Sequence, residues 1–123
     1  DVEGERSKVG IITSHFLSKR KNNPRKSQDR KRQAYALVKA MDHFRQKADK
    51  LIVLGDFNDT LNSETLNILM TKQQLKSSQN CKLGEYKGDA IDHILFRGLK
   101  CQNHKVIDLL NYSDHNAIFG IFN

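Results

Sequence analysis

Residues 51–54 form a continuously apolar run that is followed by Gly55. An unbroken apolar run of this length, ended by a glycine, is typical of a strand buried on both faces of a sheet. Asp56 and Asn58 come directly after it, so an acid and an amide leave the sheet at the carboxyl end of this strand. The run therefore predicts a layered α/β fold with polar chemistry at one edge of the sheet.

Further elements are predicted around this run. Residues 9–13 are apolar and β-branched, which is typical of a strand, and His15 lies just past its end. Residues 28–48 repeat apolar side chains at three- and four-residue steps, the period of one helix face. Ser63 is predicted to cap a second helix that packs beside the strand at 51–54.

The later part of the sequence is predicted to add paired strands. Gly88 and Asp89 indicate a tight hairpin turn, in which the preceding residues pair with a strand at 90–97. A last strand is predicted at 117–122. The expected architecture is α/β, a mixed β-sheet with helices packed on one face in a single domain.

The net charge of +7 is concentrated in one segment. Residues 19–32 contain eight cations and one acid, whereas the rest of the chain carries 13 basic and 13 acidic residues. Concentrated positive charge favours a polyphosphate backbone, because each neutralised phosphate releases counterions. A solvated or disordered basic loop is the alternative. The predicted nucleic-acid contacts are Lys19, Arg20, Lys21, Arg25, Lys26 and Arg30.

Membrane and zinc-binding classes are disfavoured. No apolar run approaches the roughly 20 residues that a bilayer span needs, so no membrane partner is expected. Cys81 and Cys101 lack the spacing of a zinc site. Their state stays open between free thiols and one disulfide.

Polar residues follow several of the predicted strands and turns. Each alone has a structural explanation as a turn cap, a hairpin residue or a structural histidine. Together they supply what phosphodiester cleavage needs, namely oxygen ligands for a hard cation, a base, donors to phosphate oxygens and a group near the leaving oxygen. The candidate residues are His15, Asp56, Asn58, Asp92, Asp114 and His115.

Strand geometry separates the two histidines that follow aspartates. His93 should point away from Asp92, towards the face of Leu95, because successive strand side chains face opposite ways. It is therefore expected to be structural. His115 is then the candidate partner of Asp92, which would orient its ring and raise its basicity.

The order of these motifs resembles the endonuclease/exonuclease/phosphatase superfamily, which includes deoxyribonuclease I. The motifs that carry the resemblance are His15 after a strand, Gly55-Asp56-Phe57-Asn58, Ile91-Asp92-His93 and Ser113-Asp114-His115. Two further stretches are similar to secreted bacterial nucleases of this superfamily, namely His15-Phe16-x-Ser18-Lys19 and Arg30-x-x-Gln33-Ala34-x-Ala36-Leu37. This likeness favours DNA or RNA over lipid and inositol phosphates, and it suggests a secreted protein.

The resemblance also implies a metal site. Asp56 would position or deprotonate the attacking water near the metal, and Asp114 would assist in metal binding. Asn58 would hold a phosphate oxygen. The implied cofactor is Mg²⁺, with Mn²⁺ or Ca²⁺ as alternatives.

The remaining roles complete the expected function. The Asp92–His115 pair would bind and polarise the scissile phosphate, and His15 would contact the phosphate or help the leaving group. The expected function is a metal-dependent phosphodiesterase, a nuclease acting on DNA or RNA. One alternative is a non-catalytic nucleic-acid-binding or structural subunit, and another is a phosphatase or lipid phosphodiesterase on the same scaffold.

The chain departs from the family pattern at its start. The family's domain is a four-layer sandwich of two similar halves, and the first half carries an asparagine and the principal metal-binding glutamate. Residues before the strand at 9–13 match neither motif. Residues 1–123 therefore resemble the C-terminal half, and a complementing N-terminal half or partner chain is expected.

Overall fold

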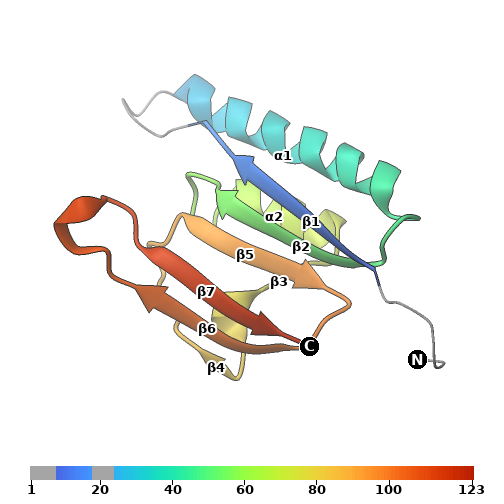
Figure 1. Ribbon diagram of the computed structural model, residues 1–123. Helices are drawn as coiled ribbons and strands as arrows, with labels where there is room; N and C mark the ends of the chain where they lie inside the picture. Colours follow the sequence, from blue (N-terminus) through green and yellow to red (C-terminus); the bar gives the residue numbers. More distant parts are fainter. Residues whose placement is uncertain (1–7, 18–23) are drawn as a thin grey trace.

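The computed structural model describes residues 8–17 and 24–123, except for the side chains of residues 24–26. Helices and strands alternate in the first half of the chain, and strands dominate the second half (Figure 1). The helices are α1 (Pro24–Phe44) and α2 (Glu64–Lys72), with short 3₁₀ turns at η1 (Ser78–Asn80) and η2 (Leu110–Tyr112). The strands are β1 (Val9–His15), β2 (Lys50–Asp56), β3 (Lys76–Ser77), β4 (Leu83–Gly84), β5 (Asp92–Arg97), β6 (Cys101–Ile107) and β7 (Ala117–Phe122).

The strands form a mixed arrangement. The larger sheet has the order β1-β2-β5-β3, in which β1 and β2 are parallel and the other pairs are antiparallel. The smaller sheet has the order β4-β6-β7, with β4 parallel to β6 and β6 antiparallel to β7. Figure 1 shows β7 and β6 on the side of β5 that is away from β1. The predicted α/β class with a mixed sheet is confirmed.

Both helices cover the same face of the larger sheet. Leu51, Val53 and Leu95 point to this face and belong to one buried cluster with side chains of α1 and α2. The helix side chains that complete the cluster are Ala34, Met41, Leu66 and Leu69. The prediction of helices on one face is therefore confirmed. Neither helix within the described residues is long and apolar enough to cross a membrane.

The opposite face of β1 is open. Val9 and Ile11 alternate with the residues that face the helices, and their side chains are 43% and 66% exposed. His15 lies on this open face too, because alternate residues of a strand share a face. The exposed apolar stretch of β1 thus leads directly to a candidate site residue.

Several predicted boundaries shift. Helix α1 spans residues 24–44 rather than 28–48, since the chain turns after Phe44, where Lys47 N–H donates to its carbonyl. Strand β1 extends through His15 and β2 through Asp56, so these residues are the last of their strands. The Ser63 cap is confirmed, with its Oγ accepting from Leu66 N–H at 3.2 Å.

The predicted hairpin at Gly88 and Asp89 is wrong. These residues do form a turn, and Ala90 N–H donates to Lys87 O at 3.2 Å. However, the strand before it, β4, pairs with β6 and not with β5. The turn leads into β5 without pairing the segments on its two sides, because Glu85 N–H donates instead to His104 O in β6.

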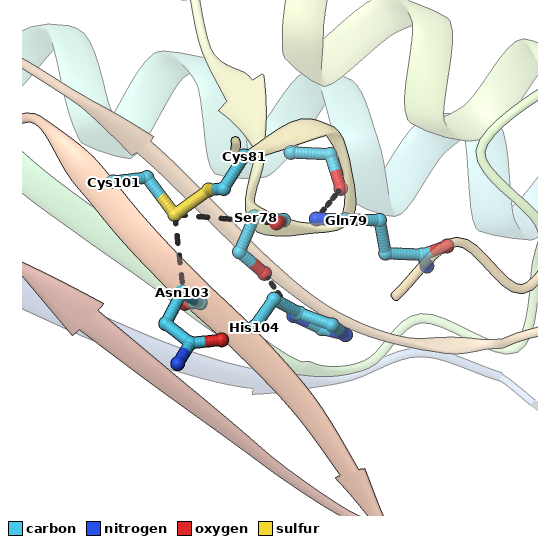
Figure 2. The surroundings of a disulfide bond; sticks show 7 residues. Ser78, Gln79, Cys81, Cys101, Asn103 and His104 are labelled. Carbon is cyan, nitrogen blue, oxygen red and sulfur yellow. Dashed lines mark hydrogen bonds between the residues drawn. A yellow bond between two sulfur atoms is a disulfide. The ribbon is translucent and has the colours of Figure 1, made fainter. Parts of the chain in front are cut away.

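Strand β6 was not predicted, and a disulfide attaches it to the preceding segment. Cys101, at the start of β6, is bonded to Cys81, just after η1, with the two Cα atoms 5.5 Å apart. Figure 2 shows the disulfide next to a buried contact between the Ser78 hydroxyl and Nδ1 of His104. Of the two states that the sequence left open, free thiols and one disulfide, the structure has the disulfide.

Candidate active site

Strand register aligns the acidic residues at one end of the sheet. His15 of β1 pairs with Asp56 of β2, and Asp56 pairs in turn with Asp92 of β5. These are the terminal residues of β1 and β2 and the first residue of β5. Partners in register point to the same face, so the three side chains lie side by side on the open face.

Gly55 allows β1 and β2 to approach closely beside the site. Its φ is +147°, and a Cβ atom built there would lie 1.9 Å from the carbonyl oxygen of Ser14. Any other residue would therefore push the two strands apart and adopt a strained backbone. The glycine of the Gly-Asp-Phe-Asn motif thus sets how near His15 comes to Asp56.

His115 joins the group from the loop before β7. Its Nδ1 lies 2.7 Å from Oδ2 of Asp92, and its Nε2 lies 3.6 Å from Oδ2 of Asp56. Its backbone N–H donates to the Ser113 hydroxyl at 3.1 Å, which holds the loop at this position. The predicted contact between Asp92 and His115 is confirmed.

The contact with Asp92 changes the acidity of the imidazole. The hydrogen bond to Asp92, reinforced by the negative charge of that carboxylate, raises the pKa of His115. His15 approaches from the other side, with its Nε2 3.5 Å from Oδ2 of Asp56. One carboxylate oxygen of Asp56 therefore faces two imidazole rings.

Asn58 is buried behind this cluster in a left-handed backbone conformation, with φ at +51°. Its side-chain Nδ2 donates to Phe16 O at 2.7 Å, and its backbone N–H donates to Asp56 Oδ1 at 2.9 Å. Asn58 thus joins the segment that follows β1 to the segment that follows β2. One hydrogen of its side-chain amide is therefore used inside the protein.

Within the part of the chain that the structure describes, three side chains lie together where they could hold a metal ion, namely Asp56, Asp92 and His115. Each offers a ligand atom, and these atoms all lie within 4.8 Å of one another. The two carboxylates suit a hard divalent cation such as Mg²⁺ or Mn²⁺, whereas an imidazole is a ligand more typical of transition-metal ions. The group includes Asp92, which the sequence did not assign to the metal, and it does not include Asp114. Asp114 instead lines the adjacent pocket beside His115.

The sequence of the chain is similar to that of a known protein family. The sequence matches the model of the Endonuclease/Exonuclease/phosphatase family over residues 3–115. The chain belongs to this family. Members of the family are hydrolases by name. The cluster formed by Asp56, Asp92 and His115, called the acidic cluster below, lies within the matched residues. The comparison with curated protein sequences gave no match.

Solved structures share the family fold. A mannosyl-6-phosphatase from Bacteroides thetaiotaomicron superposes with a TM-score of 0.72 and 16% identity, covering 92% of this chain and 50% of that chain. The human Nocturnin catalytic domain has a TM-score of 0.64 and 22% identity, covering 90% and 47%. Beta toxin from Staphylococcus aureus has a TM-score of 0.55 and 16% identity, covering 92% and 52%. The chain thus spans about half the length of these family structures.

His93 is structural, as predicted. It is buried, and its Nε2–H donates to the backbone carbonyl of Asp59 at 2.7 Å. Its ring packs near Phe57, with the centroids 6.0 Å apart. Burial lowers the pKa of His93, which favours the neutral ring. His93 therefore supports the backbone just after Asn58.

One predicted nucleic-acid contact is wrong. Arg30 is buried, and its Nε donates to Oδ2 of Asp59 at 3.0 Å, with both side chains less than 8% exposed. A guanidinium in the interior and paired with a carboxylate cannot also hold a backbone phosphate at the surface. A buried and an exposed cation look the same within a basic run of sequence, which is why the run suggested a binding role.

The rest of the basic segment is only partly described. Lys19, Arg20 and Lys21, and the side chains of Arg25 and Lys26, lie outside the described residues. The cations that follow Arg30 form ion pairs on α1 or with α2, namely Lys31 with Glu64 and Arg32 with Asp29. The nucleic-acid prediction therefore now concerns five cations, Lys19, Arg20, Lys21, Arg25 and Lys26.

A pocket of about 310 Å³ opens beside Asp92 and His115. Its walls also include Lys87, His104 and Asn116, none of which was predicted as a site residue. Strand β6, which carries His104, is rich in polar residues and lacks the alternation that would have revealed it. Only the folded arrangement brings these side chains close to Asp92 and His115.

Proposed function

We propose that this chain contributes to a metal-dependent phosphodiesterase that hydrolyses DNA or RNA. The observation that carries the proposal is the Asp92–His115 pair, whose ring also faces Asp56. An imidazole oriented by one carboxylate and adjacent to another is suited to binding a phosphate and moving a proton at its Nε2. The family match supports the hydrolase class, and the choice of nucleic acid is our inference.

The residues around this pair have separate tasks in the proposal. Asp56, which is 18% exposed, accepts a proton from the attacking water or orients it. The imidazole of His115 donates to an oxygen of the scissile phosphate. Asn58 uses its remaining amide hydrogen on a phosphate oxygen. His15, which is 75% exposed, contacts the phosphate from the other side or supports the leaving group.

A divalent cation fits beside Asp56. Mg²⁺ is proposed, with Mn²⁺ or Ca²⁺ as alternatives, because carboxylate oxygens and phosphate oxygens are the ligands these ions prefer. A bound cation would polarise the phosphate and neutralise charge that builds up on it. Asp92 and His115 lie within reach of the same position. We also propose that Asp114, beside His115 in the same loop, assists binding.

Nucleic acid is favoured by the charge of the chain. Five cations, Lys19, Arg20, Lys21, Arg25 and Lys26, lie close together in the sequence, and a long polyanion uses such a run better than a small headgroup. A phosphatase or lipid phosphodiesterase is the enzyme alternative, as a mannosyl-6-phosphatase shares the fold. A non-catalytic nucleic-acid-binding subunit is the other alternative.

We also propose a complementing half and an oxidising compartment. The chain spans about half the length of the mannosyl-6-phosphatase and Nocturnin structures, and Val9 and Ile11 leave apolar side chains exposed on the face of β1 that carries His15. A second half bearing a further carboxylate ligand would cover these side chains and complete the metal site. The Cys81–Cys101 disulfide supports a secreted protein, since such bonds persist mainly outside the cytosol.

Cleavage assays test this function. Supercoiled plasmid, single-stranded RNA, bis-p-nitrophenyl phosphate and p-nitrophenyl phosphate are incubated with the chain, with and without a complementing half, in Mg²⁺ and in chelator. We expect Mg²⁺-dependent cleavage of the nucleic acids and of the diester, with little action on the monoester. Preferred hydrolysis of the monoester would favour the phosphatase, and nucleic-acid binding without cleavage would favour the non-catalytic subunit.

Matched variants connect the activity to the site. Asp56→Asn and His115→Ala should each abolish cleavage. Asp49→Asn and His43→Ala are the controls, since these residues are exposed and lie away from the acidic cluster. Equal loss in the control variants, or full activity in Asp56→Asn, would contradict the proposed site.

A further inference from the structure

Helix α1 contacts both strand-end segments that carry the candidate catalytic residues. Oε1 of Gln33 accepts from the backbone N–H of Leu17 at 3.0 Å, two residues after His15. Nε of Arg30 donates to Oδ2 of Asp59 at 3.0 Å, one residue after Asn58. Arg30 and Gln33 are three residues apart on α1, so they share one face of the helix.

The two segments are also joined to each other. Phe16 N–H donates to Asp56 O at 2.8 Å, and Nδ2 of Asn58 donates to Phe16 O at 2.7 Å. The buried rings of Phe16 and Phe57 pack edge to face, with centroids 5.0 Å apart. The ends of β1 and β2 therefore form one connected unit, and α1 holds it from behind through Arg30 and Gln33.

The Arg30 contact has no direct access to a substrate. The Arg30 and Asp59 side chains are 6% and 7% exposed, and the Asp59 carbonyl is held from β5 by His93 at 2.7 Å. A buried ion pair is weak evidence for stability, because desolvation offsets the attraction between the charges. The Arg30–Asp59 pair lies directly behind Asn58, and this position favours a role in holding the geometry of the turn after β2.

His15 needs such support because its own side chain is largely exposed. With 75% of the side chain in solvent, little packing fixes the ring, so its place depends on the backbone of residues 15–17. The Gln33 contact to Leu17 fixes that backbone where it leaves the sheet. The Nε2 of His15 can then remain 3.5 Å from Asp56.

We propose that Arg30 and Gln33 are positioning residues that hold His15 and the Asp56–Asn58 turn at their working separation. The inference rests on the proposed function of this site. In this proposal both residues act through other groups, Gln33 through the backbone N–H of Leu17 and Arg30 through the buried carboxylate of Asp59. A small displacement at a reacting group can lower the rate by up to roughly 100-fold, so these contacts would affect turnover more than substrate affinity.

Paired variants at Gln33 give the sharpest test. Gln33→Met keeps the size of the side chain and removes the acceptor for Leu17 N–H, whereas Gln33→Glu keeps an acceptor oxygen. Gln28→Met on the exposed side of α1 is the matched control. We expect faster amide hydrogen exchange at Leu17 in Gln33→Met alone. For the same variant, kcat on the diester substrate should fall with KM nearly unchanged. Gln33→Glu should have the wild-type exchange rate at Leu17 and the wild-type kcat.

Arg30→Met tests the second contact, with Arg32→Met as its control, since Arg32 is exposed and pairs only locally with Asp29 among the described contacts. Faster exchange at the Asn58 amide is expected in Arg30→Met and not in Arg32→Met. If Arg30→Met does not fold, as circular dichroism would show, the Gln33 variants still decide the proposal.

The exchange measurements need no turnover, so they separate this proposal from the proposed function. A chain without hydrolytic activity would count against the function, while the exchange rates at Leu17 and Asn58 would still report on the contacts. Unchanged exchange and unchanged kcat in Gln33→Met would overturn the positioning role. Equal losses in Gln33→Met and Gln33→Glu would do the same.

Discussion

Asp92 and His115 come from different segments of the chain, yet Oδ2 of Asp92 lies 2.7 Å from Nδ1 of His115. The carboxylate favours the protonated ring, and it is the first cause of the raised pKa of His115. The ring is thereby turned so that Nε2 faces Asp56 at 3.6 Å. One contact sets both the orientation and the acidity of the imidazole.

Replacing this carboxylate should separate the two effects. Asp92→Asn keeps the shape of the side chain and removes its charge, so the pKa of His115 should fall towards its ordinary value. NMR titration of the His115 ring, in the wild type and in Asp92→Asn, measures this shift. Diester hydrolysis should fall by roughly 100-fold or more, the usual contribution of a positioned acid or base. A His115 pKa that does not change on substitution would contradict the pairing.

The basic segment should bind backbone phosphate without reading sequence. Replacing Lys19, Arg20, Lys21, Arg25 and Lys26 by alanine should weaken binding to unrelated duplexes equally. The slope of log affinity against log salt should decrease by up to about 0.9 for each lost phosphate contact. Fluorescence anisotropy at several salt concentrations provides the measurement. The control replaces five exposed lysines elsewhere, Lys39, Lys72, Lys76, Lys82 and Lys100. Equal slopes in both variants would reduce the segment to a solvated loop.

The disulfide should make a measurable contribution to stability. The bond closes a loop with a sequence separation of 20, which corresponds to about 3 kcal/mol in the chain-entropy estimate. The double variant Cys81→Ser and Cys101→Ser should lose about that free energy of unfolding in urea titrations. A reducing agent should destabilise the wild-type chain and leave the double variant unchanged. Identical urea midpoints under oxidising and reducing conditions would argue against this contribution.

Stability should also depend on pH through a buried histidine. Burial lowers the pKa of His104 from 6.5, so below that pH the unfolded chain binds a proton that the folded chain does not. The free energy of unfolding should therefore fall as pH drops below 6.5, by at most about 1.4 kcal/mol per pH unit. His115 has the opposite sign, because its raised pKa gives stability below 6.5 that is lost at higher pH.

A pair of variants isolates the His104 contribution. His104→Asn should make the free energy of unfolding less dependent on pH between about 7 and 5. His43→Asn, at an exposed position of α1, should leave the dependence as in the wild type. Urea titrations at a series of pH values measure both. Equal pH dependence in His104→Asn and the wild type would show that His104 is protonated as readily in the folded chain.

Much of the sheet could be predicted because its strands have simple patterns. The apolar run at residues 51–54 belongs to β2, and the last strand matches its predicted bounds at residues 117–122. The alternation of side chains along a strand also predicted correctly that His93 and Asp92 point to opposite faces of the sheet. The small polar strand β6 gave no such pattern, and its place depends on pairing with β4 and β7 and on the disulfide.

The arrangement of the site shows what sequence order leaves out. The motif residues were identified from their positions after strands, but the grouping of Asp92 with Asp56 and His115 depends on the antiparallel register of β2 and β5. Arg30 was assigned to the surface because its neighbours in sequence are cations. Its partner Asp59 lies 29 positions away, and only the packing of α1 on the sheet brings the two together.

Gly55 has a consequence for anyone who wishes to redesign this chemistry. Because a Cβ atom there would collide with the main chain of Ser14, the spacing between the ends of β1 and β2 is a property of the backbone. Side chains at positions 15, 56 and 115 can be exchanged to try other reactions while that spacing persists. Position 55 offers no such freedom. In a library that varies it, the variants would have β1 and β2 pushed apart at the site.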